Sequence, residues 1–332
     1  MAVEATAFAR AGLVGNPSDG YFGKTISFVV RDFAAKVSLY DHREVEIVPS
    51  LRDRSAYRTL RELVDDVKHY GYYGGIRLVK ATIRRFVEYC DAQGIALPER
   101  NFSIRYRTTI PRHVGLAGSS ALVTATLRCL MEHYEVDIPM VTQPNVVLSV
   151  ETQELGISAG LQDRVVQVFE GCVFMDFDRE LMEREGHGRY EPIDPELLPK
   201  LFIAYRTDLA EGSEVFHNDI RARWNRGDAE VVQAMKDFAG YADEVRSLLV
   251  AGRGDAIGPW LDRNFDRRRS LYNISPGNLE LIERARAAGA HCKFSGSGGA
   301  IVGTYADEAA FARIQAAFED TSTVVLKPTV AA

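Results

Sequence analysis

Two carboxylates in this sequence are spaced so that they could share one reaction centre. Glu151 lies near the end of a predicted helix, and Asp163 follows twelve residues later in the segment GLQD. Phosphoryl transfer needs a metal ligand, a group that accepts or orients the nucleophile's proton, and cations near the moving phosphoryl group. The pair could supply the first two of these. A pair with this spacing is also common by chance, so a structural role for both residues stays open.

The stretch PRHVGLAGSSA, residues 111–121, follows a predicted strand and opens a predicted helix. Glycines let the backbone come close to a bound anion, and the first amides of a helix favour negative charge. Ser119 and Ser120 could cap the helix, or they could place a hydroxyl on a phosphate or a magnesium ion. The stretch therefore predicts phosphate binding, with helix capping as the alternative.

Two further stretches carry several glycines. KFSGSGGA, residues 293–300, has more glycine and serine than a hairpin needs, which predicts a backbone that runs beside a ligand. GNPSDGYFGKT, residues 15–25, ends like a phosphate-binding loop. That loop requires a glycine at position 18, where this chain has Ser18. The stretch is therefore a turn, or a site of another kind.

The chain has 332 residues, enough for two domains. Its net charge of −6 does not support binding to nucleic acid or to an anionic membrane, so we expect neither partner. The four cysteines are scattered and form no C-x-x-C pair, which argues against a zinc site or a disulfide framework. No signal peptide or long apolar run is present, and the expected location is the cytoplasm.

Hydrophobic periodicity predicts strands and helices in mixed order. The expected strands are 25–30, 36–41, 45–49, 102–110, 172–177, 201–207 and three short strands after residue 290. The expected helices are 57–69, 74–93, 121–134, 143–155, 214–226, 228–251, 254–271, 276–288 and 307–319. The order lacks a βαβ rhythm, which favours an α+β fold. A charged, proline-containing stretch at 178–199 indicates a division into domains at 1–190 and 191–332.

Taken in order, the three glycine-bearing stretches resemble the three motifs of the GHMP kinase superfamily. ARAGLVGN, residues 9–16, is similar to P-G-R-V-x-L-x-G-E. Residues 111–121 are similar to P-x-x-x-G-L-G-S-S-A, and residues 293–300 to K-x-T-G-G-G-x-G-G. The chain departs from these motifs at Ala9, Asn16 and Ala117, and in the third motif it reads SGSGGA.

A closer likeness is to the glucuronokinase-type sugar-1-kinases. It is carried by the segments GNPSDGYFGKTISF, GLAGSSALV, ELGISAGLQDRVVQ, NFDRRRSLY and KFSGSGGAIV. The resemblance implies a ribosomal-protein-like N-terminal domain and a ferredoxin-like C-terminal domain, with the active site in the cleft between them. It implies a kinase that uses ATP and Mg²⁺ to phosphorylate the anomeric hydroxyl of D-glucuronate. The alternatives are another sugar (galacturonate, galactose, fucose or a heptose) and a non-catalytic binding protein of the same fold. The oligomeric state stays open.

The resemblance also implies roles for individual residues. Asp163 would accept or orient the proton of the anomeric hydroxyl, and Arg10 would stabilise the charge beside it. Ser120, alone or together with Ser119, and Glu151 would hold magnesium. The residues expected at ATP are Gly115, Leu116, Ala117, Gly118, Ser119 and Ser120. Those expected at the sugar are Asp19, Tyr21, Gln162, Gly296 and Ser297. Lys24 could face the sugar, the phosphates or solvent.

A glucuronate substrate adds a carboxylate, which arginine binds through two parallel hydrogen bonds. The candidates are Arg221, Arg223, Arg267, Arg268 and Arg269. Residues two apart do not share a helix face, so Arg221 and Arg223 cannot both point inward. We prefer Arg223, followed by Asn264 and Arg268, and a solvated helix face is the alternative for each.

Overall fold

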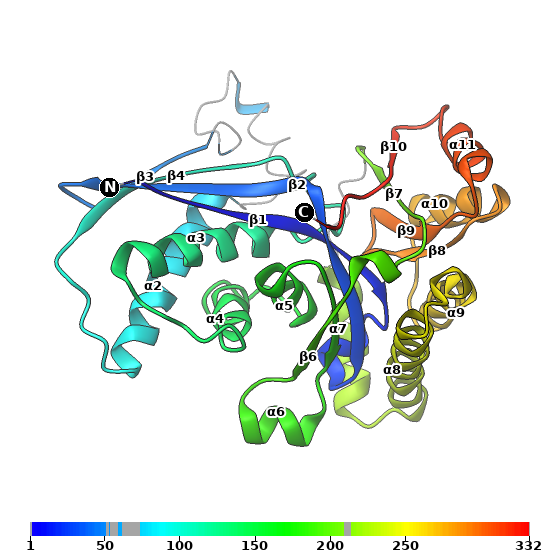
Figure 1. The fold of residues 1–332 in the computed structure, drawn as a ribbon, viewed down its shortest axis with the longest axis horizontal. Coiled ribbons are helices and arrows are strands. Elements are labelled where there is room, and N and C mark those ends of the chain that lie inside the picture. Colours follow the sequence, from blue (N-terminus) through cyan, green and yellow to red (C-terminus); the bar gives the residue numbers. More distant parts are fainter. Residues whose placement is uncertain (1, 51–52, 54–58, 62–73, 209–213, 332) are drawn as a thin grey trace.

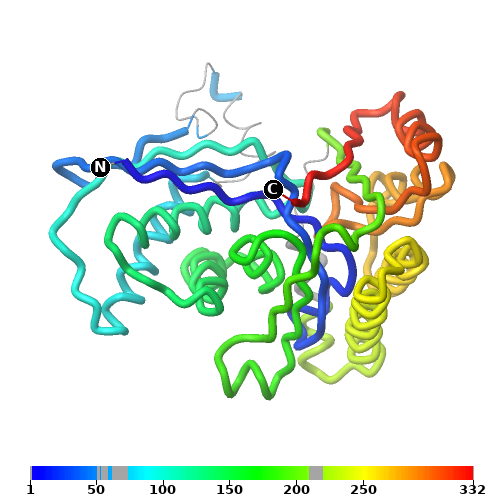
Figure 2. The backbone as a smooth tube through the Cα atoms, viewed as in Figure 1, coloured from blue at the N-terminus to red at the C-terminus, as the bar shows by residue number. Residues whose placement is uncertain are grey.

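The computed structural model describes residues 2–50, 53, 59–61, 74–208 and 214–331. Two sheets lie side by side, each with helices packed against it, and the chain completes the strands of the first sheet before those of the second (Figure 1). The colour gradient of the backbone shows the same order, blue to green and then yellow to red (Figure 2). The mixed content confirms the α+β class. The helix expected over 57–69 lies almost entirely outside the described residues.

A long central strand organises the first sheet. Its strands are β1 (Ala2–Val14), β2 (Lys24–His42), β3 (Glu46–Val48), β4 (Asn101–Thr108), β5 (Cys172–Asp176) and β6 (Arg189–Ile193). β1 pairs antiparallel along β2, while β4 and β5 pair with the C-terminal and N-terminal halves of β2. The predicted strands 25–30 and 36–41 are thus parts of one strand.

A bulge divides the two halves of β2. The register with β1 jumps from Ala9 opposite Val30 to Phe8 opposite Ala34. A bulge bends a strand and frees backbone groups for other partners. Here the amide of Arg31 donates to the carbonyl of Thr329 at 2.9 Å, which ties the C-terminal segment to the first sheet.

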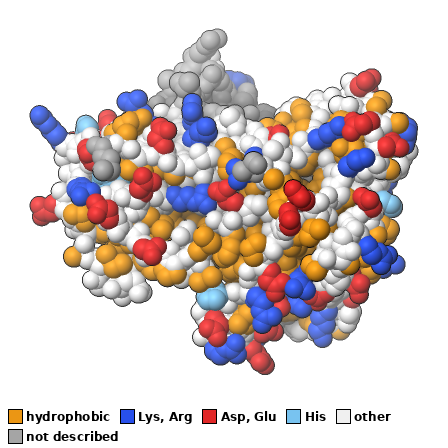
Figure 3. Space-filling model, viewed as in Figure 1, with side chains coloured by type: hydrophobic (Ala, Val, Ile, Leu, Met, Phe, Trp, Pro, Cys, Tyr) orange, Lys and Arg blue, Asp and Glu red, His pale blue; other side chains and the backbone are white. Residues whose placement is uncertain are grey.

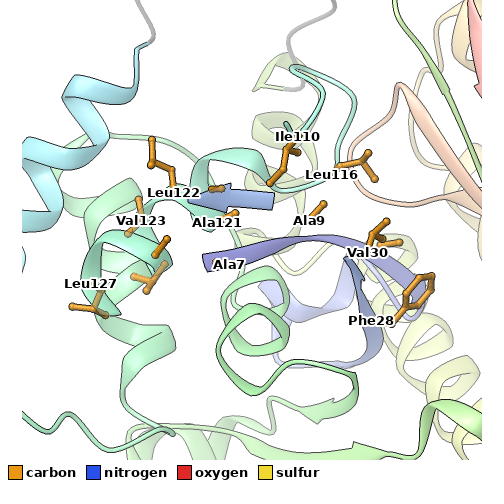
Figure 4. Close-up of a cluster of buried hydrophobic side chains, with 14 of the residues drawn as sticks. Ala7, Ala9, Phe28, Val30, Ile110, Leu116, Ala121, Leu122, Val123 and Leu127 are labelled. Atoms are coloured by element: carbon orange, nitrogen blue, oxygen red, sulfur yellow. The ribbon is translucent and has the colours of Figure 1, made fainter. Parts of the chain in front are cut away.

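The alternation of β1 places its small residues in the core. Ala7, Ala9 and Ala11 are fully buried. They let the helix α3 (Gly118–Tyr134) approach the strand closely, and Ala121 and Leu122 of that helix belong to the same buried apolar cluster (Figure 4). Alanine is depleted in strands, which is why propensity alone did not predict this one.

Helices cover one face of the first sheet (Figure 1). They are α2 (Gly75–Ala92), α3, α4 (Gln143–Ser149) and α5 (Gln162–Phe169). The helix predicted over 143–155 ends as an α-helix at Ser149 and continues as one wide π-helical turn, Val150–Glu154. Such turns often occur at functional sites because they turn a side chain out of the regular helical spacing.

The second sheet has the order β10-β7-β9-β8 and is antiparallel. Its strands are β7 (Leu201–Arg206), β8 (His291–Phe294), β9 (Ala300–Thr304) and β10 (Thr323–Leu326). The helices α9 (Gly258–Arg269), α10 (Pro276–Ala287) and α11 (Glu308–Ala316) pack against it, while α8 (Ala229–Val250) packs against β2 of the first sheet and α7 (Glu214–Asn225) packs against α8. The predicted helix 254–271 begins four residues late, after a 3₁₀ turn at Gly254–Ala256.

The stretch 178–199 is more ordered than its composition suggested. It contains the helix α6 (Arg179–Glu185) and the strand β6, which pairs with β5. The first sheet thus extends three residues past the expected boundary at 190, and we propose that the domains divide between Ile193 and Leu201. One apolar cluster runs through both halves and includes Val30, Ala242 and Val302.

Lys and Arg side chains intermingle with Asp and Glu across the face seen in Figure 3. This mixture agrees with the modest net charge of −6. Among the residues that the structure describes, no helix combines the length and the apolar character needed to cross a bilayer.

Candidate active site

Arg10 on β1 joins the three motifs. Its backbone amide donates to the carbonyl of Leu116 at 3.1 Å. Its guanidinium Nη1 donates to the carbonyls of Gly115 at 3.1 Å and Ser295 at 2.8 Å. Its Nη2 forms an ion pair with Asp163. Stretches of sequence separated by up to 285 residues therefore meet at one buried arginine that is 4% exposed.

Asp163 lies in the first turn of α5 with a cation on each side. Besides Arg10, Nη1 of Arg164 lies 3.2 Å from its Oδ2. Burial alone would raise the pKa of Asp163, but Arg10 and Arg164 outweigh it and hold the pKa below its usual value. The carboxylate therefore stays ionised at neutral pH and can accept a hydrogen bond from a bound hydroxyl.

Glu151 projects from the π-helical turn into the same region. Arg164 forms an ion pair with its Oε2, and Ser119 Oγ donates to its Oε1 at 2.7 Å. Both Glu151 and Arg164 are almost fully buried, so each needs the charge of the other. Ser120 Oγ instead donates to the carbonyl of Ala117 at 3.2 Å. The structure thus places Ser119, rather than Ser120, beside the carboxylate expected to bind magnesium.

The second motif forms a tight loop ahead of α3. Gly115 and Ala117 both have left-handed backbones, with φ of 66° and 59°. The first backbone hydrogen bond of the helix runs from the amide of Ala121 to the carbonyl of Ala117. The amides of residues 118–120 precede that bond, and such amides have no acceptor within the helix. They can bind phosphate oxygens at the end where the helix dipole favours anions.

The third motif packs directly against this loop. A Cβ atom on Gly115 would lie 2.8 Å from the carbonyl oxygen of Gly298, and one on Gly296 would lie 2.5 Å from the carbonyl oxygen of Gly115. Both distances are too short for a real Cβ atom. These glycines therefore allow the backbones of the two halves to touch, and they do so beside Arg10.

Asp19, in the short 3₁₀ helix Ser18–Tyr21, lies next to Asp163. Its Oδ2 accepts a hydrogen bond from the amide of Gln162 at 3.4 Å. Burial, reinforced by the charge of Asp163, raises the pKa of Asp19 to about 6. A side chain at Gly160 would collide with this carboxylate. Asp19 is thus positioned as a second acceptor close to the reacting carboxylate.

Several residues expected at the sugar instead hold the loops of the site. The side chain of Asn264 accepts from the amide of Gly15 at 2.7 Å and donates to the carbonyl of Asn16 at 3.1 Å. Arg268 is buried and donates to the carbonyls of Gly296 at 2.8 Å and Ser297 at 3.1 Å. Both residues lie on α9, which therefore fixes the first and third motifs at once.

Gln162 and Lys24 also have partners within the protein. The side chain of Gln162 accepts from Ser27 Oγ at 3.2 Å, and only its backbone amide contacts Asp19. Lys24 Nζ lies 2.9 Å from Asp243 and 3.7 Å from Asp176. Of the three possibilities for Lys24, the structure shows a partly exposed residue at a strand end, held by two acidic side chains.

Arg223, our preferred arginine for a substrate carboxylate, is held by two acidic residues. Its Nε lies 2.9 Å from Asp228 and its Nη2 lies 2.8 Å from Glu230. Both partners lie at the start of α8 on the surface. Because its guanidinium already binds these two carboxylates, we no longer expect Arg223 to bind the carboxylate of the substrate.

The oxygen atoms of the site fit a magnesium ion whose remaining ligands would be phosphate and water oxygens. Within the described residues, no group of three His, Cys, Asp or Glu side chains could hold a metal alone. Magnesium in phosphoryl-transfer sites usually takes one or two protein oxygens and completes its shell with phosphates and water. The hydroxyl of Ser119 and the carboxylate of Glu151 match that pattern.

Sequence reasoning missed one residue of the site. Arg164 links Glu151 to Asp163. It follows Asp163 directly, but adjacency along the chain gives no sign of a shared ion pair. Ser119 was among the candidates for phosphate or magnesium, but the sequence could not decide between it and the adjacent Ser120.

The fold and the three convergent motifs define a GHMP kinase, and the chain belongs to that family. Residues 77–171 match the family described as GHMP kinases N terminal domain, and residues 245–322 match GHMP kinases C terminal. The family resemblance seen in the sequence is thereby confirmed.

The relatives fall into two groups. Glucuronokinase 1 of Arabidopsis thaliana is 43% identical over 307 residues, which cover 91% of this chain and 84% of that protein. Solved structures share the fold at low identity. Lactococcus lactis galactokinase complexed with galactose has a TM-score of 0.76 at 14% identity, covering 99% of this chain and 93% of that chain. Streptococcus pneumoniae phosphomevalonate kinase with phosphomevalonate and AMPPNP has a TM-score of 0.75 at 16% identity, covering all of both chains.

Proposed function

We propose that this protein is an ATP- and magnesium-dependent sugar 1-kinase that converts D-glucuronate to D-glucuronate 1-phosphate. One observation carries the chemistry: Asp163 lies between Arg10 and Arg164, next to the Ser119–Glu151 pair and the start of α3. The substrate is supported by the 43% identity with a plant protein named for action on glucuronate.

Asp163 would orient the anomeric hydroxyl and accept its proton. A low pKa makes it a weak base, yet phosphoryl transfer passes through a loose transition state that asks little of base strength. The reaction needs an acceptor in a fixed position and positive charge nearby. The ion pairs with Arg10 and Arg164 hold Asp163 in place and supply that charge.

Arg10 would also neutralise charge on the phosphoryl group in flight. The amides at the start of α3 would bind the phosphates of ATP, and the glycines of the third motif would close over them. Magnesium held by Ser119 and Glu151 would offset the negative charge of the phosphates. The presence of AMPPNP in the phosphomevalonate kinase structure supports ATP as the phosphate donor here.

The test is ADP release, followed with a coupled assay, across glucuronate, galacturonate, glucose, galactose, fucose and a heptose. We expect turnover of glucuronate, and a loss of about 10²–10⁴-fold in kcat for Asp163→Asn, the range contributed by a positioned acid or base. A variant with near-full turnover would contradict the role of Asp163. Preference for a neutral sugar would keep the kinase and overturn the substrate.

A further inference from the structure

The arginines of the second half differ in whether a substrate could reach them. Arg223 is held by Asp228 and Glu230, as described above. Arg267 Nε lies 2.8 Å from Asp237. Arg268 is buried, and its guanidinium already donates to two backbone carbonyls. These side chains hold the protein together, and taking up a substrate carboxylate would require breaking their present contacts.

Arg221, on α7, has a different environment. Its side chain is exposed, and none of the carboxylates whose side chains the structure describes (those of residues 214–219 are not among them) forms an ion pair with it. Its guanidinium carbon lies 4.2 Å from the centre of the Tyr21 ring. Its Nη2 lies 3.0 Å from the position that a Cβ atom on Gly20 would occupy. The head group is therefore placed over the short 3₁₀ helix Ser18–Tyr21.

The Tyr21 ring gives this arginine a fixed support. Tyr21 is 6% exposed, and its ring meets Trp224 edge-on with centroids 5.2 Å apart. A guanidinium that lies over an aromatic face keeps its N–H groups in its own plane, free to bind a carboxylate with two parallel hydrogen bonds. Arg221 is thus oriented without being neutralised.

The position of Arg221 also links it to the reacting end of the site. Tyr21 follows Asp19 by two residues, and Asp19 lies next to Asp163. Burial raises the pKa of Tyr21, and the charge of Asp19 adds to this while Arg221 opposes it. A continuous series of side chains therefore runs from the reacting carboxylate to an exposed cation: Asp163, Asp19, Tyr21 and Arg221.

We propose that Arg221 binds the carboxylate of the sugar-acid substrate and that Tyr21 orients it for that contact. The inference rests on the proposed function. A hexuronate carries its carboxylate on C5, on the other side of the ring oxygen from the anomeric carbon, so the two groups need separate partners. Asp163 lies at one end of the series and Arg221 at the other.

The experiment compares D-glucuronate with D-glucuronamide, which replaces the carboxylate with a neutral amide of similar shape. We expect Arg221→Ala to raise KM for glucuronate by roughly 10–100-fold, the loss of a charge-assisted contact. Its kcat should stay near that of the wild type, and its kcat/KM for glucuronamide should not change. Arg221→Lys keeps the charge but loses the paired geometry, so it should recover only part of the affinity.

Arg223→Ala is the matched control, since it removes an arginine from the same helix while leaving Arg221 in place. It should retain the wild-type preference for glucuronate. If the wild type turns over glucuronate and glucuronamide equally well, the site does not recognise the carboxylate and the role of Arg221 is overturned, whereas a lack of turnover of glucuronate would overturn the proposed function. If the wild type does distinguish them but Arg221→Ala and Arg221→Lys keep both the preference and the KM, the role of Arg221 alone is overturned.

Discussion

Ser119 and Ser120 are adjacent in the sequence, but their hydroxyls serve different partners. The hydroxyl of Ser119 faces Glu151, and that of Ser120 faces the carbonyl of Ala117. We expect Ser119→Ala to raise the magnesium concentration needed for half-maximal activity by about tenfold or more. Ser120→Ala should lose one buried hydrogen bond, about 1 kcal/mol of unfolding free energy, with little change in the magnesium requirement.

A magnesium titration of the two variants, with thermal melting as the control for folding, checks this assignment. A larger shift in the magnesium requirement for Ser120→Ala than for Ser119→Ala would show that Ser120 binds magnesium, as the sequence first indicated.

The raised pKa of Asp19 predicts that sugar binding depends on pH. Its pKa is raised to about 6, so above that pH it is ionised and can accept hydrogen bonds from sugar hydroxyls. We expect KM for the sugar to rise as pH falls through about 6. The pKa of Asp163 is lowered, so Asp163 stays ionised over the same range. Measuring KM from pH 5 to 8 for the wild type and Asp19→Asn tests this, and equal profiles would contradict it.

The same shift predicts a stability effect of definite sign. Because the folded pKa lies above the usual 3.8, the folded state binds the proton more tightly. Stability should therefore fall as pH rises from about 4 to about 6, by roughly 2 kcal/mol for a group of this partial exposure. Asp19→Asn should remove that fall, and its unfolding free energy at pH 7.5 should exceed that of the wild type.

At the scale of elements, α9 couples the two halves of the site. Asn264 fixes the loop after β1, and Arg268, four residues later on the same face, fixes the third motif. We expect Asn264→Ala to cost about 2–3 kcal/mol of stability, because it leaves a buried amide and a buried carbonyl without partners. KM for the sugar should rise with it, since Asp19 lies in the freed loop.

Surface residues of the same helix give the control for Asn264. Arg263 lies over Trp260, at 4.4 Å from the ring centre, and contacts neither motif. Arg263→Ala should leave KM unchanged. A wild-type KM in a destabilised Asn264→Ala would show that the tether supports the fold without positioning the sugar site.

Elements with strong periodicity were predictable, and those shaped by close packing were not. The helices now called α3 and α8 carry long apolar patterns, and their predicted ranges 121–134 and 228–251 lie close to Gly118–Tyr134 and Ala229–Val250. β1 was not predicted because its core face consists largely of alanine, which is depleted in strands. Alanine is suitable there because its small side chain lets α3 pack closely against the strand.

The wide turn at Val150–Glu154 also has no sequence signature, since its residues continue the helical pattern. It matters because it carries Glu151. The family resemblance predicted that Arg10 would lie beside Asp163, but the sequence favoured Arg223 over Arg221 for the substrate carboxylate. The residues that decide between those two, Tyr21 and Asp228, lie on other elements.

At the scale of the whole molecule, the two sheets come together around one buried ionic network. Arg10 from the first half binds the carbonyl of Ser295 from the second, and Lys293 Nζ donates to the carbonyl of Gly12 at 2.7 Å. Burial, with Arg268 and Arg10 nearby, holds the pKa of Lys293 well below its usual value. The catalytic groups are thus fixed by contacts between the halves, which explains why no single segment contains the site.

The most direct test of the account is the position of the phosphate on the product. Purified protein, ATP, magnesium and D-glucuronate would be incubated together, and the product examined by phosphorus and proton nuclear magnetic resonance. We expect one phosphorylated sugar whose phosphorus couples to the anomeric proton, and its formation should be about 10²–10⁴-fold slower with Asp163→Asn. A phosphate on any other hydroxyl, or a phosphorylated product that forms equally well with Asp163→Asn, would contradict it.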